Sequence, residues 1–348
     1  MIVIDKVMNE EYDASSLALV QRKKYIKLLA EVYGMKMFFL NIFNDNNKQI
    51  CILPFFIVRD KLIKRKIVSM PFDGAFGGPV FLYGNNMDMN KGEWIYLINW
   101  AKANNIPTIE IRTRNSNNKA LKQLGFSEYS NLIGSELELS SISDAWKKLN
   151  KGHKWSINKF KKNKYILSKD STYQDIKEFY HIMSKNMKLY GTPMYPLSYF
   201  EKMWNEYSEK ENVILVKCTK DNKLIGGAFV LFNGEVAIYK YCSVISAYIQ
   251  DCVYHGIVWY IINESIRRKC KVLNLGTSFI DDQGLIYFKE AFGAKSYTVY
   301  SYLYQEKSKN YHTVDAMRKK YNWIIKIWRH LPLFLVERLS YFFWKNFC

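Results

Sequence analysis

Two segments of the chain repeat the same order of elements, and this repeat limits the possible folds more than any other feature. INWAKANNIPTIEIRT…LKQLGF (residues 98–126) and IINESIRRKCKVLNLGTS…FKEAFGA (residues 261–294) each predict a helix, a strand, a second helix and a glycine. The likeness is one of element order, with little residue identity. It predicts an α/β (α+β) protein that contains two copies of one helix–strand unit.

Length and composition agree with two domains. The chain has 348 residues, of which 49% are hydrophobic and 16% aromatic, so it exceeds the usual single-domain size and can form two cores. We expect a first domain over residues 1–140, a second over 141–308 and a separate C-terminal segment over 309–348. Apolar runs predict strands at residues 50–58, 67–72, 108–113 and 271–278, with a turn cluster at 73–79.

Charge and cysteine usage indicate the setting of the protein. Its formal charge is +19, which raises the local concentration of nucleic acid, anionic lipid or phosphorylated metabolites. The six cysteines are scattered, as is typical of reduced cytoplasmic thiols. The N-terminus lacks the basic and apolar regions of a signal peptide, and no uncharged apolar run is long enough to span a membrane. We therefore expect a cytoplasmic protein.

The C-terminal segment has a different character. Residues 317–347 mix Trp, Phe and Leu with basic residues, and Pro332 divides them. This pattern is typical of a segment that lies on an anionic membrane surface, which would make the protein peripheral at the inner face. The alternative is a pair of helices packed on the second domain. The basic residues are Arg318, Lys319, Lys320, Lys326 and Arg329.

Familiar catalytic signatures are missing. The chain has no Gly-x-Ser-x-Gly elbow, no His-Glu-x-x-His, no phosphate-binding Walker loop and no Gly-x-Gly-x-x-Gly. Its five histidines show no metal-ligand spacing, and each is expected to be an ordinary surface or packing residue. We expect no metal site and no permanently bound cofactor.

Polar residues at the end of one strand form the first candidate site. Gly276, Thr277 and Ser278 are the last residues of the strand expected at residues 271–278, at the sheet edge where ligands bind in open α/β folds. The helix that comes next places Lys289 on the same face as Leu285 and Phe292. Either Lys289 extends its ammonium into water, or the ammonium lines a cleft and meets an anion or a reacting carbonyl.

Two further segments could contact a substrate. Tyr190, Gly191 and Thr192 begin a loop stiffened by prolines, which could hold substrate or could be a structural connection. Residues 146–165 predict one amphipathic helix with His153 on its apolar side and lysines on the others. Those lysines form either a solvated face or an anion-binding surface.

An ordered set of motifs resembles the Fem family (FemA, FemB, FemX) of peptidoglycan-bridge aminoacyltransferases and their relatives in surface-polysaccharide clusters. The motifs are FDGAFGGP, WKKLNKGHKWSINKFKK, NMKLYGTPMYPLSYF and LNLGTS…GLIYFKEAFGA, and the likeness covers about residues 54–304. The resemblance implies two tandem GNAT-type N-acyltransferase domains. It also implies transfer of an acyl group, often an aminoacyl group from charged tRNA, to an amine of a cell-envelope precursor that is lipid- or nucleotide-linked.

The resemblance assigns roles to particular residues. The family's Phe-Lys pair falls on Phe288 and Lys289, which would then act in catalysis and contact the carrier, so that Lys289 lines the acyl-transfer cleft. The proton of the amine could pass to Tyr287, to a carboxylate such as Asp281 or to the leaving group. Relatives have arginine in the helix between the domains, where this chain has Lys154 and Asn158. These two residues are the candidates for phosphate binding.

Three functions fit this sequence. The favoured one is a Fem-like acyltransferase whose donor is aminoacyl-tRNA or acyl-CoA. The second is an acyl-CoA-dependent N-acyltransferase on an amino sugar in polysaccharide biosynthesis, although residues 243–256 lack the glycine-rich loop that binds the CoA pyrophosphate. The third is a protein without enzymatic activity that binds RNA or membrane through its charge.

Overall fold

The structure is a computed structural model, and it divides into two compact units, each built from more than one stretch of the chain. The first unit contains Met1–Ile133, Tyr297–Met317 and Phe342–Cys348; the second contains Gly134–Ser296 and Arg318–Tyr341. The first unit therefore includes most of a strand, β13 (Lys295–Gln305), that comes after residues 134–296 of the second unit in sequence. The described residues are 1–6, 22–58, 65–69, 77–83, 88–114, 118–209, 212–306 and 322–346.

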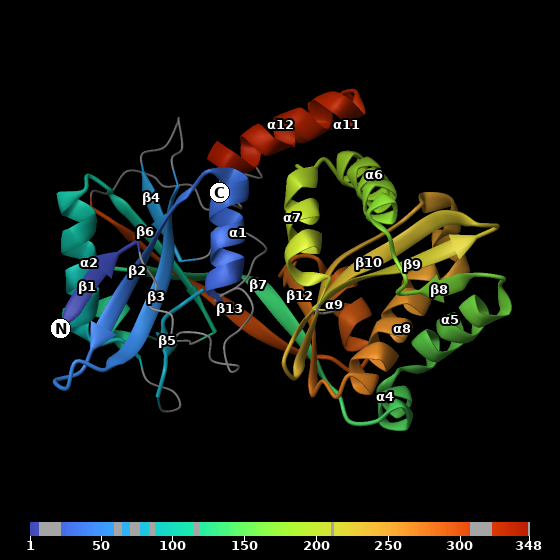
Figure 1. Ribbon diagram of the computed structural model, residues 1–348, viewed down its shortest axis with the longest axis horizontal. Helices are drawn as coiled ribbons and strands as arrows, with labels where there is room; N and C mark the ends of the chain where they lie inside the picture. Colours follow the sequence, from blue (N-terminus) through green and yellow to red (C-terminus); the bar gives the residue numbers. More distant parts are fainter. Residues whose placement is uncertain are drawn as a thin grey trace. The chain divides into compact units, whose positions relative to one another are not determined.

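A mixed sheet forms the centre of the first unit, with strands in the order β1-β2-β3-β4-β6-β13 (Figure 1). Strand β4 runs parallel to β6, and β13 runs antiparallel to β6, with Tyr300 opposite Thr113. The strands are β1 (Ile2–Asp5), β2 (Lys36–Phe43), β3 (Gln49–Val58), β4 (Lys66–Val68), β6 (Thr108–Thr113) and β13 (Lys295–Gln305), and β5 (Val80–Phe81) pairs with β3.

The strands predicted at residues 50–58 and 108–113 are confirmed by β3 and β6. The strand predicted at residues 67–72 is shorter, because β4 ends at Val68. Residues 70–76 lie outside the described part of the chain, and most of the predicted turn cluster lies there.

Helix α2 (Lys91–Ala103) shows why this part of the sequence forms a helix against the sheet. Its N-terminus is closed by a capping box, in which the Asn90 side chain accepts the Glu93 N–H at 3.1 Å and the Glu93 carboxylate accepts the Asn90 N–H at 2.8 Å. Its buried residues recur at steps of three and four: Trp94, Leu97, Ile98 and Ala101. The other helices of this unit are α1 (Lys23–Tyr33) and α3 (Lys119–Gln123).

A buried ion cluster joins β4 to β6. Glu110 accepts hydrogen bonds from the Lys66 ammonium at 2.9 Å and from Arg112 Nε at 2.8 Å. Burial acts to raise the pKa of Glu110, but the charges of Arg112 and Lys66 outweigh it and hold that pKa well below its usual range. The carboxylate therefore stays ionised inside the first unit.

The strands of the second unit follow one another in the order β7-β12-β11-β10-β9-β8. Strands β11 and β12 are parallel, and the remaining pairs from β11 to β8 are antiparallel. Strand β12 confirms the strand predicted at residues 271–278. The strands are β7 (Ser127–Glu138), β8 (Ile166–Ser168), β9 (Val213–Lys220), β10 (Lys223–Asn233), β11 (Val236–Val244) and β12 (Val272–Phe279).

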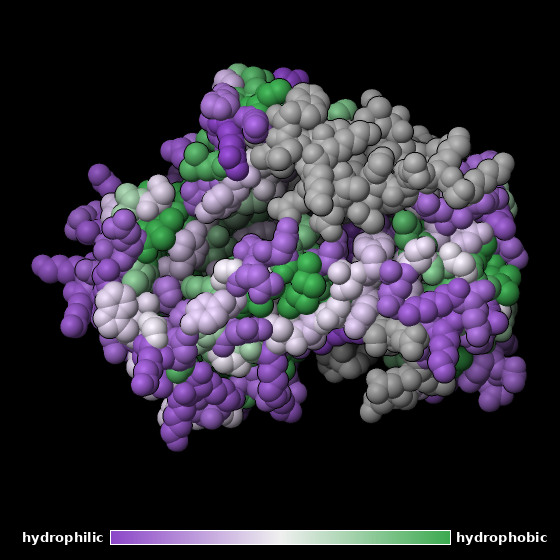
Figure 2. All heavy atoms as spheres, turned by 180° about the vertical axis from the view of Figure 1, so that it is seen from behind, coloured by the Kyte–Doolittle hydropathy of each residue, from purple (hydrophilic) through white to green (hydrophobic). Residues whose placement is uncertain are grey.

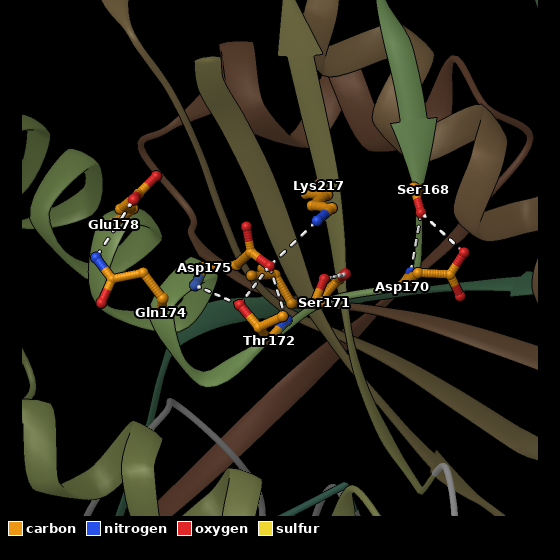
Figure 3. A network of polar contacts seen from close by, with 9 residues as sticks. Ser168, Asp170, Ser171, Thr172, Gln174, Asp175, Glu178 and Lys217 are labelled. Carbon is orange, nitrogen blue, oxygen red and sulfur yellow. Dashed lines mark hydrogen bonds and ion pairs between the residues drawn. The ribbon is translucent and has the colours of Figure 1, made fainter. Parts of the chain in front are cut away.

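Helix α6 (Tyr173–Tyr190) starts at a polar network that ties it to β9 (Figure 3). Asp175 accepts the Thr172 N–H at 2.7 Å and the Lys217 ammonium at 3.1 Å. The Thr172 hydroxyl in turn accepts the Asp175 N–H at 3.3 Å. One carboxylate thus satisfies a free N–H at the helix start and pairs with a lysine of the neighbouring strand.

The single amphipathic helix expected over residues 146–165 is wrong. The structure has two helices, α4 (Ile142–Lys148) and α5 (Lys151–Lys162), because Leu149 and Asn150 are extended. The Asn150 side chain accepts the His153 N–H at 2.7 Å and caps α5. Gly152 lies inside α5, so the break comes from the cap and not from the glycine.

Helix α5 packs very closely on α8 (Val253–Arg267). A Cβ atom added at Gly256 would lie 2.4 Å from the ring of Phe160, which no real contact allows. Gly256 is therefore required for the close approach of the two helices. The unit also contains α7 (Leu197–Tyr207), a 3₁₀ helix η2 (Ser246–Asp251) and α9 (Gln283–Glu290).

Two C-terminal helices, α11 (Asn322–His330) and α12 (Leu333–Asn346), are separated at Pro332, as the sequence indicated. Trp328 and Val336 are buried, and the Ser340 hydroxyl accepts the Met194 N–H at 2.9 Å. Packing on the second unit, the alternative left open by the sequence, is thus observed for this side of the helices. Among the described residues, no helix combines the length and apolar character needed to cross a membrane.

The contact between Gly256 and Phe160 gives a test of the packing. We expect Gly256→Ala to lower the free energy of unfolding by about 1–3 kcal/mol, because the new methyl group overpacks the interface between α5 and α8. Gly152→Ala, in α5 but with only Asn150 Oδ1 at 3.6 Å, should be neutral or stabilising by up to about 1 kcal/mol. Urea unfolding measures both. Adding Phe160→Leu should restore part of the loss, and additive effects of the two substitutions would contradict the direct contact.

Candidate active site

The end of β12 is shaped by a glycine in the left-handed region. Gly276 has φ +73°, which is strained for any residue with a side chain. Its N–H donates to the Asn274 side chain at 2.7 Å, and its carbonyl oxygen accepts a hydrogen bond from Lys289. The kink therefore turns one backbone carbonyl of the strand toward the next helix.

Helix α9 brings Lys289 to this carbonyl. The Asp282 side chain accepts the Leu285 N–H at 3.1 Å and fixes the start of the helix. Lys289 is only 4% exposed, and its Nζ donates to the Gly276 carbonyl at 3.1 Å and to the Ser278 hydroxyl at 2.9 Å. The interpretation in which Lys289 reaches into water is wrong, and the charged group lies inside the second unit.

The environment of Lys289 changes its acidity. Burial lowers the pKa of Lys289 to about 8, and the more distant Asp282 acts in the opposite direction. No carboxylate of the described residues forms an ion pair with this ammonium. Two of its three N–H donors are satisfied by the Gly276 carbonyl and the Ser278 hydroxyl, and at neutral pH most of the lysine carries a positive charge.

Four aromatic rings hold α9 against α5 and α8. His153 of α5, His255 of α8 and the phenyl rings of Phe288 and Phe292 form one cluster, with ring centroids 4.4–6.2 Å apart. His153 Nε2 lies 3.1 Å from the Phe288 carbonyl oxygen. Burial lowers the pKa of His153, and burial together with His153 lowers that of His255 to about 4. Both rings are therefore neutral at pH 7.

The two predicted catalytic residues next to Lys289, Phe288 and Tyr287, have different surroundings. Phe288 is part of the ring cluster and positions the backbone of α9. Tyr287 is 63% exposed, and its hydroxyl accepts a hydrogen bond from Asn150 at 3.1 Å, at the start of α5. The described contacts do not join Tyr287 to Lys289. Asp281 is exposed.

The predicted substrate residues Tyr190, Gly191 and Thr192 lie at the end of α6. Gly191 takes φ +71°, and the Thr192 N–H donates to the Met187 carbonyl at 2.9 Å, which ends the helix as predicted. Tyr190 is 59% exposed. Burial raises the pKa of Tyr254 at the start of α8, and Cys242 and Tyr190 contribute. The end of α6 thus lies near the residue that precedes His255.

Three predicted substrate residues lie at the end of β12. Two of them, Gly276 and Ser278, accept hydrogen bonds from Lys289. Thr277 lies between them and is partly exposed. Lys154 and Asn158 lie on α5, where Asn158 is exposed and the Lys154 ammonium is 3.5 Å from the Lys147 carbonyl. Phosphate binding by these two residues stays a prediction.

Sequence reasoning missed the pairing of His153 with His255. It treated each histidine separately, although His153 had been placed on the apolar side of its helix. The close packing at Gly256 brings the adjacent His255 to it, with ring centroids 4.6 Å apart. Among the described residues, no group of His, Cys, Asp and Glu side chains is arranged to hold a metal ion.

Comparison with known proteins shows which fold this is. No protein-family model and no curated protein sequence matches the chain. The structure of FemX is similar over 93% of this chain and 100% of its own, with a TM-score of 0.67 and 13% identity. The C-terminal domain of a putative lysylphosphatidylglycerol synthetase from Agrobacterium fabrum is similar over 82% of this chain and 87% of its own, with a TM-score of 0.53 and 11% identity.

A third structure, a conserved protein of unknown function from Bacteroides thetaiotaomicron VPI-5482, is similar over 88% of this chain and 100% of its own, with a TM-score of 0.59 and 14% identity. These likenesses establish the fold. The α/β class inferred from the repeated helix–strand unit is confirmed, and so is the structural resemblance to the Fem family.

The buried ammonium predicts an unusual dependence of stability on pH. The pKa of Lys289 is about 8 in the folded protein and about 10.5 in the unfolded chain, so between these values the unfolded state binds more protons. The folded state should therefore gain stability as pH rises through this range. Relative to Lys289→Met, we expect the wild type to gain about 2–3 kcal/mol between about pH 7 and pH 10. Urea unfolding of both proteins measures it, and parallel pH curves would contradict the burial.

Proposed function

We propose that this protein is an acyltransferase that transfers an acyl group to an amine of a cell-wall or surface-glycan precursor, with the Lys289 ammonium stabilising the charge that develops on the acyl carbonyl. The observation that carries the proposal is the buried ammonium with no carboxylate partner among the described residues. The fold shared with FemX and the motif resemblance support the class of reaction.

The proposed reaction requires a positively charged hydrogen-bond donor that is fixed beside the acyl carbonyl oxygen. The amine nitrogen forms a bond to the acyl carbon, and the carbonyl oxygen becomes negative. When the bond from carbon to the carrier oxygen or sulfur breaks, the amine proton passes to that leaving atom. Stabilising the oxyanion with a preorganised donor is usually the largest single contribution to such catalysis. Hydrogen bonds to Gly276 and Ser278 fix the position of the Lys289 ammonium, and the proposal assigns its third N–H group to the oxyanion.

The start of α8 favours an aminoacyl ester over a CoA thioester as the donor. A CoA pyrophosphate would bind at a helix N-terminus through free N–H groups. Here the 3₁₀ helix η2 precedes α8, and the Asp251 carboxylate lies next to the first turn, where it accepts a hydrogen bond from the Tyr165 hydroxyl. This carboxylate opposes binding of a pyrophosphate, while the Lys159 ammonium, 2.9 Å from the adjacent Gln250 carbonyl oxygen, acts in the other direction. We therefore propose aminoacyl-tRNA as the donor.

Transfer of an acyl group from CoA to an amino sugar is the second candidate, and the exposed Tyr190 at the end of α6 could contact a sugar equally well. The donors are separated by incubating the protein with aminoacyl-tRNA or acyl-CoA and with nucleotide- or lipid-linked amine acceptors, followed by mass spectrometry. Consumption of acyl-CoA alone would overturn the proposed donor. If neither donor is consumed and a deletion strain keeps an unchanged cell envelope, the protein is not this enzyme.

The role of Lys289 has a specific kinetic consequence. We expect Lys289→Met to lower kcat by about 10²–10³-fold with little change in KM, the effect of losing one oxyanion donor. In the wild type, kcat should fall as pH rises through about 8, because Lys289 loses its proton there. Lys295→Met is the matched control, since Lys295 is exposed and pairs with Glu138. A rate unaffected by Lys289→Met would rule out this mechanism.

A further inference from the structure

The two C-terminal helices have an inner and an outer side. Val336 and Ser340 of α12 are fully buried, and Trp328 of α11 is 7% exposed. The Met194 N–H, just after α6, donates to the Ser340 hydroxyl, and α11 packs against α6. These contacts fix which side of the helices faces away from the second unit.

The outer side carries large apolar residues in water. Phe334 is 67% exposed, Ile327 is 51% exposed and Leu339 is 41% exposed. At 100° per residue, Phe334 and Arg338 lie opposite Val336 and Ser340 on α12. Burying such side chains is favourable, so a group of them exposed on neighbouring turns is a candidate contact surface for an apolar partner.

The same surface is basic. Lys326, Arg329 and Arg338 are exposed, and none of them forms an ion pair among the described residues. Figure 2 shows hydrophobic and hydrophilic residues side by side along these helices, at the top of the view. We call Ile327, Phe334, Leu339, Lys326, Arg329 and Arg338 the outer surface of α11 and α12.

We propose that this outer surface docks on an anionic phospholipid membrane. Phe334, Ile327 and Leu339 enter the boundary between headgroups and acyl chains, while the three basic residues contact lipid phosphates. A second copy of the chain is a poorer occupant, because a two-fold dimer through this surface would bring the same basic residues face to face. Neither helix spans the bilayer, so the attachment is peripheral and reversible.

The test is co-sedimentation of the full-length protein with vesicles of phosphatidylglycerol and phosphatidylcholine, compared with vesicles of phosphatidylcholine alone. We expect binding to the anionic vesicles that weakens with salt. Each basic residue contributes about fivefold to partitioning, so K326Q/R329Q/R338Q should weaken binding by on the order of 100-fold. Phe334→Ser should also weaken it while leaving the fold intact, because the side chain is exposed.

A matched control variant removes three positive charges from the first unit instead. Lys91, Lys102 and Lys119 are exposed residues of the first unit, and K91Q/K102Q/K119Q should change binding by less than about threefold if the outer surface is responsible. Equal losses in both triple variants would overturn the proposal, as would equal binding to neutral and anionic vesicles or binding to neither. Self-association that Phe334→Ser abolishes, measured by sedimentation velocity, would assign the surface to a second copy instead. None of these readouts requires enzymatic activity.

Discussion

The site of the second unit depends on one interaction, the hydrogen bonding of a buried lysine ammonium to the end of β12. An isolated charge inside a protein is costly, and here only a backbone carbonyl and a hydroxyl compensate for it. The same burial lowers the pKa of Lys289 to about 8. A fold retains such a group at the expense of stability when the charge has a use, and an acyl carbonyl that becomes negative is one.

The ammonium is held in place by helices that pack closely around it. Gly256 lets α5 approach α8 so closely that any side chain would collide with Phe160. This approach brings together His153 and His255, whose rings pack with Phe288 and Phe292. Phe288 and Phe292 flank Lys289 in sequence, so the ring cluster sets the position of α9 and of its lysine.

The surface of the protein combines a large positive charge with exposed apolar side chains on α11 and α12. A charge of +19 attracts polyanions of many kinds, and by itself does not choose among them. The structure places three of the basic residues beside exposed Phe334, Ile327 and Leu339. A mixed basic and apolar surface matches a phospholipid interface better than it matches a nucleic acid, for which the aliphatic side chains would have no partner. A site held near the membrane would suit a lipid-linked acceptor.

Local patterns in the sequence determined the elements. The strands at residues 50–58, 108–113 and 271–278, the buried side of α2 and the end of α6 at Gly191 all follow from periodicity, caps and glycine, which act between near neighbours. The apolar position of Lys289 also followed from its helix. Tertiary structure alone decided that β13 joins the sheet of the first unit, that His153 meets His255 and that Tyr287 lies away from Lys289. These outcomes depend on contacts between residues distant in sequence, where packing and not local preference selects the partner.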